Sequence, residues 1–162
     1  MKPSRDPQQV LAGVALIVAP LLGAGLKMLS AGWTIMFLMF GPVVILLAGY
    51  VVQIIIAAQG FLSSGDLFGS ARGRATLAAW VTSVAVVGVG IFFPDGTDGP
   101  RGSTFQKWLG SYGPNAEAVH AATDIWSEWL AIALTVVWVA SYVWLLVEWI
   151  AALRRRKSKV RS

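Results

Sequence analysis

The longest apolar segment of the chain is WTIMFLMFGPVVILLAGYVVQIIIAA, which runs from Trp33 to Ala58 and carries no charged residue. At about 1.5 Å per residue, a helix of this length exceeds the roughly 30 Å hydrocarbon core of a bilayer. Only Gly41-Pro42 and Gln53 interrupt it, and we expect the helix to be tilted or kinked at the glycine–proline pair. The segment predicts a membrane-spanning helix.

Three further apolar runs flank this segment, at residues 10–26, 75–93 and about 129–153. Of the 162 residues, 56% are hydrophobic and 13% are charged, whereas soluble domains carry about 25% charged residues. We predict an all-α integral membrane protein, a single transmembrane domain over residues 1–162 with four helices in a bundle. The last helical pattern begins near Pro114, so the fourth helix is expected to extend beyond the bilayer.

Lysine and arginine are distributed unevenly between the two ends of these runs. Ten lie on the side of the termini, six of them in the tail at residues 154–162, and three lie on the other side, at Lys27, Arg101 and Lys107. The positive-inside rule therefore predicts cytoplasmic N- and C-termini and an outer loop at residues 94–124. The basic tail is expected to attract anionic lipid, and no nucleic acid partner is expected.

The residue types needed for redox or thiolate-metal chemistry are scarce, since the chain has no cysteine and one histidine. Glu117, His120, Asp124 and Glu128 are spaced to lie on one helical face, and Glu-x-x-His occurs in metal sites of helical bundles. No second cluster completes a ligand shell, which favours a solvated acidic face and leaves Glu117, His120 and Asp124 as weak metal candidates. We expect no catalytic residues and no cofactor, and bound lipid is compatible with this architecture.

The predicted outer loop contains a turn followed by a helix signal. The turn starts at Asp95 with the spaced carboxylates and glycines of a calcium loop, but Gln106 stands where that loop needs a glutamate. Ser103 and Gln106 form a capping-box pattern. Four side chains then share one face of a short amphipathic helix of about eight residues, which caps the bundle, lies among the headgroups or docks a partner: Phe105, Trp108, Leu109 and Tyr112.

Two patterns predict helix packing. Ala75, Ala79 and Ser83 are spaced by four in the third run, which allows close approach of another helix, more readily one of this chain than one of another subunit. Trp138, Tyr142 and Trp149 form an aromatic stripe on the fourth helix. This stripe is expected to contact a partner subunit, lipid or a cofactor.

Several polar residues and prolines lie within or beside the spans. We expect Gln53 to hydrogen-bond another helix, and Glu148 to reach the inner interface or to pair with Arg72 or Arg74. Lys27 is expected to pair with Glu128 at the outer boundary. Pro20 and Gly41-Pro42 lie at similar depths and predict a paired kink, which either shapes the first two helices or exposes backbone groups to a substrate.

Two functions are compatible with these features. The leading hypothesis is a non-catalytic accessory or scaffold subunit of a larger membrane protein complex, because no catalytic constellation is present. The alternative is a small homo-oligomeric transporter or channel that uses the kinked helices 1 and 2, and an enzyme ranks third. The abundance of Ala, Gly and Val hints at a bacterial source, and hence at the bacterial cytoplasmic (inner) membrane.

Overall fold

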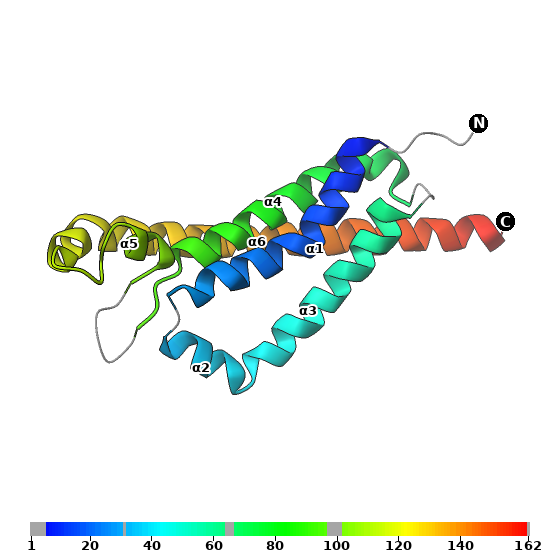
Figure 1. Cartoon of the computed structure of the whole chain (residues 1–162). Helices are drawn as coiled ribbons and strands as arrows, with labels where there is room; N and C mark the ends of the chain where they lie inside the picture. The colour runs from blue at the N-terminus through cyan, green and yellow to red at the C-terminus, as the bar shows by residue number, and fades with distance from the viewer. Residues whose placement is uncertain (1–5, 31, 64–66, 97–101, 162) are drawn as a thin grey trace.

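The computed structural model describes residues 6–30, 32–63, 67–96 and 102–161, and apart from one isolated β-bridge its secondary structure there is helical. Figure 1 shows the helices in chain order. They are α1 (Pro7–Met28), α2 (Trp33–Met39), α3 (Pro42–Ile56), the π-helix η1 (Ala57–Leu62), the 3-10 helix η2 (Gly69–Ala71), α4 (Arg72–Phe92), α5 (Thr104–Trp108) and α6 (Ala116–Arg161).

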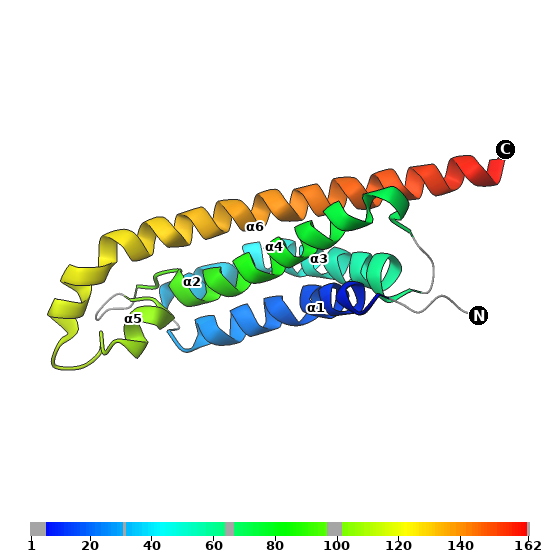
Figure 2. The ribbon, with the colours of Figure 1, turned by 90° about the horizontal axis from the view of Figure 1, so that it is seen from above.

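Four helical segments are long and apolar enough to cross a membrane, which confirms the predicted fold class at that level. They are Pro7–Met28, Pro42–Leu62, Gly69–Phe92 and Ala116–Ser158. The beginning of α1 and the end of α6 lie at the same end of the molecule in both views (Figures 1 and 2).

α4 lies between α1 and α6 in the bundle (Figure 2), and the end of α3 with η1 adds Ile56 and Phe61 to the same buried core. Small residues allow α4 to take this place, and Ala75, Ala79 and Ser83 are all buried. At Gly90, a Cβ atom would collide with the backbone of Gly23 in α1. The close helix approach predicted from these small residues is therefore made within the chain.

The predicted span at 33–58 is two helices and not one kinked helix. α2 ends before Phe40, and Gly41 has φ +153°, a backbone conformation that L side chains rarely adopt. Pro42 then starts α3, where its missing N–H costs no hydrogen bond. Because a helix cannot continue through such a glycine, α2 and α3 meet at a corner (Figure 1).

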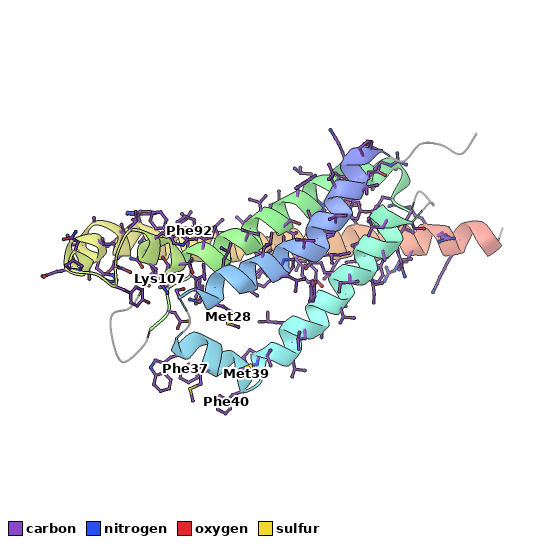
Figure 3. All side chains as sticks on the ribbon, viewed as in Figure 1. Met28, Phe37, Met39, Phe40, Phe92 and Lys107 are labelled. Atoms are coloured by element: carbon purple, nitrogen blue, oxygen red, sulfur yellow. The ribbon has the colours of Figure 1, made fainter. Side chains whose placement is uncertain are left out.

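The α2–α3 arm, defined here as residues 33–48, diverges from the bundle. Figure 3 shows Phe37, Met39 and Phe40 around the corner between the two helices, away from α4 and α6. Toward its C-terminal end α3 approaches α1 and is continued by η1 (Figure 1). The arm is joined to the rest of the chain at both ends, by α3 at one and by the hydrogen bond from the Trp33 N–H to the Gly96 carbonyl at the other, and the corner between α2 and α3 stands away from the bundle (Figure 1).

The fourth membrane helix begins well before its apolar run, as the pattern from Pro114 predicts. α6 has 46 residues, and at about 1.5 Å per residue it is about 69 Å long. This is more than twice the thickness of a hydrocarbon core. The basic residues from Arg154 onward continue the same helix to Arg161.

Candidate functional site

The end of the bundle at which α5 lies is closed by a buried ion pair. Lys27 Nζ lies 3.2 Å from Asp95 Oδ2, with side-chain exposures of 12% and 1%. The same Asp95 oxygen accepts a hydrogen bond from the Gly32 N–H at 3.0 Å, and Lys27 Nζ also donates to the Phe93 carbonyl. Asp95 and Gly102 form a β-bridge, which holds the turn between them.

The predicted pairing of Lys27 with Glu128 is therefore wrong. Asp95 follows α4 by only three residues, and the packing of α4 on α1 brings its carboxylate beside the last turn of α1. The sequence shows Asp95 only as part of a glycine-rich turn, and nothing local in that turn shows that the carboxylate is buried.

α5 links the end of α1 to α6. The predicted capping box is present, since the Gln106 N–H donates to Ser103 Oγ and the Ser103 N–H donates to Gln106 Oε1. Gln106 Nε2 donates to Thr123 Oγ1 at 3.0 Å and to Asp124 Oδ1 at 2.7 Å. On the other side, Thr104 Oγ1 donates to the Leu26 carbonyl at 2.7 Å.

The predicted apolar face of this helix is divided between two environments. α5 has five residues instead of about eight, so Leu109 and Tyr112 lie beyond it. Phe105 packs against Phe92 and Trp126, with ring centroids 5.1 and 5.2 Å away. Trp108, Leu109 and Tyr112 are exposed.

A cavity of about 800 Å³ lies at this end of the bundle. We call it the Trp33–Glu128 cavity, after residues of α2 and α6 on its wall. It is lined by Trp33, Phe37, Pro94, Asp95, Gly96, Gly102, Gln106, Asp124, Ser127 and Glu128. Its volume is within the range of small-molecule sites in proteins. We take it as the candidate functional site.

The polar groups on the cavity wall are mainly hydrogen-bond acceptors. Asp95 is neutralised by Lys27, whereas Asp124 Oδ1 accepts from Gln106 and lies 2.9 Å from His120 Nδ1. Glu128 is exposed, and it forms no hydrogen bond or ion pair with any residue that the structure describes. Among those residues, no lysine or arginine lines the cavity, so its wall favours a cation over an anion.

The weak metal candidates are brought together only in part. The structure joins His120 to Asp124, as their spacing of four on α6 allows. Within the described parts of the chain, no three histidine, aspartate or glutamate side chains converge as a metal site would require. Glu117 therefore does not complete a ligand set with the other two.

A second polar cluster lies inside the membrane-spanning region, where α3 joins the bundle. Gln53 Nε2 donates to the Leu16 carbonyl of α1 at 2.8 Å, which confirms that this amide bonds another helix. Tyr50 Oη donates to the Ile17 carbonyl, and Tyr142 Oη of α6 donates to the Gly49 carbonyl, both at 2.8 Å. The role of Tyr50 has no sequence signal other than its position one turn before Gln53.

The aromatic stripe of α6 makes contacts within the chain at two of its three positions. Tyr142 reaches α3, and Trp149 Nε1 donates to Gln59 Oε1 of η1 at 3.2 Å. Trp138 is half-buried, and its Nε1 has no hydrogen-bond partner among the described residues. The stripe thus packs mainly against the second membrane span, through Tyr142 and Trp149.

Glu148 is paired as expected. Arg74 Nε donates to Glu148 Oε1 at 2.8 Å and Arg74 Nη2 donates to Oε2 at 3.4 Å, which gives a two-pronged contact between α4 and α6. Glu148 is nearly buried, whereas most of Arg74 is exposed. The pair is therefore an anchor near the polar end of the bundle, at the start of α4.

Fold and site together define a helical membrane protein with four candidate spans, a polar helix junction and an acceptor-lined cavity. Compared with known proteins, the chain matches no family model, no curated protein and no solved structure. Its function is therefore argued from its own geometry.

Proposed function

We propose that this protein is a non-catalytic accessory or scaffold subunit of a larger bacterial membrane protein complex. The observation that carries the proposal is the α2–α3 arm, an apolar element of the chain whose corner diverges from its own bundle (Figure 3). We infer that an apolar transmembrane helix of another subunit packs against the arm.

The side chains of the arm support this inference. Phe40, Ile45 and Val44 are 78%, 76% and 67% exposed, and the arm carries no charged residue. Side-chain hydrogen bonds join α3 to α1 and α6 at Gly49, Tyr50 and Gln53, all beyond the arm. Helices in a four-helix bundle normally pack along their length. A neighbouring subunit that packs against the diverging arm would supply the helix contacts that the arm does not make in its own bundle.

The placement in the membrane is part of the same proposal. The ends of α1 and α6 that lie together also carry the basic residues, among them Arg154, Arg155 and Arg156. The positive-inside rule assigns this end to the cytoplasm, and the Trp33–Glu128 cavity then lies on the outer side of the bacterial inner membrane. The basic end of α6 is suited to contact with anionic lipid headgroups.

A purification and a site-specific crosslink test the proposal. The tagged protein is isolated from its native cells in mild detergent, and the copurifying chains are identified by mass spectrometry. A photo-crosslinking residue at Ile45 is expected to capture one stoichiometric membrane subunit. The matched control is Val84 of α4, which is 65% exposed on a helix that the bundle holds along its length, and a crosslinker there is expected to capture lipid.

The result that would overturn this function is a protein that purifies without a second subunit and gives the same products from Ile45 and Val84. In that case the alternative is a homo-oligomeric transporter or channel. Its support is the helix break at Gly41-Pro42, which leaves backbone groups of α2 and α3 available. Gln53 favours it less, because its amide nitrogen is engaged by Leu16.

A further inference from the structure

We propose that the Trp33–Glu128 cavity binds a primary ammonium group carried on an apolar body. The group can belong to an aminophospholipid headgroup of the surrounding bilayer or to a small amine from solution. The proposal concerns a ligand of this chain and does not depend on whether the protein is an accessory subunit.

The charge of the wall selects a cation. Of the three carboxylates that line the cavity, Asp95 already has Lys27 as its counter-ion, and Asp124 has Gln106 and His120 as hydrogen-bond partners. Glu128 lines the cavity, is exposed, and has neither an ion pair nor a hydrogen bond within the described residues, so its carboxylate has no counter-ion there. An ammonium group is a common biological cation, and unlike a metal ion it does not need several protein ligands to pair with a single free carboxylate.

A buried hydroxyl group without a hydrogen-bond partner favours a cation that can donate a hydrogen bond to it. Ser127 lines the cavity and is 2% exposed, yet its Oγ atom has no partner among the residues that the structure describes. Buried hydroxyl groups normally have a partner. Ser127 and Glu128 both line the cavity, so one primary ammonium group, with three N–H donors, can bond both, whereas a quaternary ammonium cannot donate to either.

Aromatic rings supply the remaining contact. Trp33 and Phe37 of α2 lie on the wall with ring centroids 6.4 Å apart, and both rings are partly exposed. Ring faces attract cations, and apolar ring surface also accommodates the carbon skeleton that carries the amine. Trp126 and Trp129 of α6 flank the cavity residues in the sequence, which is typical of the headgroup level of a bilayer.

The first experiment uses the whole protein in dodecyl maltoside micelles, which contain no amine. Benzylamine, protonated at pH 7, is titrated and binding is followed by calorimetry, with benzyl alcohol as the neutral probe of the same shape. We expect saturable binding of benzylamine and at least tenfold weaker binding of benzyl alcohol. Absence of saturable benzylamine binding, or equal binding of both probes, overturns the proposal.

Three variants assign the binding to the cavity. Glu128→Gln is expected to weaken benzylamine binding at least fivefold and Ser127→Ala about threefold, in line with loss of one ion pair and one hydrogen bond. Glu117→Gln removes the same charge from the same helix outside the cavity wall and is expected to bind as the wild type does. Thermal unfolding confirms that each variant is folded. Equal weakening by Glu117→Gln and Glu128→Gln would show a general charge effect and would overturn the site.

A fourth variant tests whether the chain supplies its own cation. Arg101 follows the cavity residue Gly96 by five positions and lies outside the described residues. Arg101→Gln is expected to leave benzylamine affinity within twofold of the wild type. Binding that is detected only in Arg101→Gln would make the chain's own guanidinium the occupant and would overturn the proposal.

The last experiment distinguishes the two sources of the amine. The protein is extracted from bilayers of equal phosphatidylethanolamine and phosphatidylglycerol, and retained lipid is identified by native mass spectrometry. Preferential retention of phosphatidylethanolamine that Glu128→Gln abolishes and Glu117→Gln preserves supports the proposal with a lipid as ligand. Benzylamine binding without such retention supports it with a small amine from solution.

Discussion

The side chain of Gln53 replaces a hydrogen bond that Pro20 removes. In an uninterrupted α1, the carbonyl of Leu16 would accept from the N–H of residue 20, but proline has no N–H. Gln53 Nε2 of α3 lies 2.8 Å from this carbonyl oxygen and donates to it. A backbone acceptor without a partner is costly in hydrocarbon, so the α1–α3 contact and the proline belong to one arrangement.

This arrangement predicts a coupling between the two residues. Gln53→Leu is expected to lower the free energy of unfolding by about 1 kcal/mol, the scale of interhelical hydrogen bonds in membrane proteins. In a Pro20→Ala background, the restored N–H satisfies Leu16 and the same substitution should cost clearly less. Unfolding in mixed micelles with increasing SDS measures both, and an identical cost in the two backgrounds would contradict the coupling.

The contact between Gly23 and Gly90 predicts that the effect of a glycine-to-alanine substitution on stability depends strongly on its position. At Gly90 a Cβ atom would overlap the Gly23 carbonyl oxygen and Cα, both backbone atoms that cannot rotate away. Gly90→Ala is therefore expected to force α1 from α4 and to cost about 2 kcal/mol or more.

The matched control for that experiment is Gly25→Ala in α1, where no atom lies within 4 Å of the added Cβ. This substitution should be neutral or stabilising by up to about 1 kcal/mol, since alanine is the better helix former. Thermal unfolding in the same detergent compares the two. Equal effects would show that helix propensity, and not the close approach, determines the cost at Gly90.

The Lys27–Asp95 pair predicts a loss of stability at the α5 end of the bundle. Asp95→Asn leaves the buried Lys27 ammonium beside a neutral amide, and removal of one partner from a buried pair costs about 3 kcal/mol. Adding Lys27→Met should recover part of this loss because the unpaired charge is then gone. Thermal unfolding of the single and double variants measures the recovery, and a double variant less stable than Asp95→Asn would refute it.

The Arg74–Glu148 pair is expected to contribute less. Arg74 is 63% exposed, so water and salt screen the interaction, and Arg74→Met should cost about 1 kcal/mol or less. The cost should fall further at high salt and in a Glu148→Gln background. A loss as large as that of Asp95→Asn, or one insensitive to salt, would show that Glu148 is buried more effectively than its geometry indicates.

Local features that depend only on nearby residues were predictable from the chain. The apolar runs identify four helices long enough to span a membrane, the spacing of small residues identifies the packed face of α4, and Ser103 with Gln106 identifies the start of α5. Glu148 with Arg74 was also accessible, because both follow from depth in the predicted spans. Each of these rests on a periodicity or a capping pattern within one helix, or on counting residues from a helix end.

Only individual residues of the candidate site, and not their arrangement, could be predicted from the sequence. Asp124, Glu128 and Trp33 each stood out by charge or by position, but Phe37, Ser127 and Asp95 carry no signal that places them on one wall. The cavity joins residues almost one hundred positions apart, and its shape depends on how α2 turns at Gly41 and how α6 crosses α4. Gly41-Pro42 is a local signal for that turn, whereas the crossing of α6 over α4 is set by side-chain packing between helices, for which the sequence contains no local pattern.

The difference between the features that the sequence predicts and those that it does not has one physical origin. Transfer of apolar side chains into a bilayer and hydrogen bonding within a helix are local energies, and they determine that this chain forms four helices long and apolar enough to cross a membrane. The partner of Lys27, the Gln53 contact with Leu16 and the acceptor-lined cavity depend on atoms distant in the chain. They arise when the helices pack, because a buried charge or a freed carbonyl bonds the nearest suitable group in space.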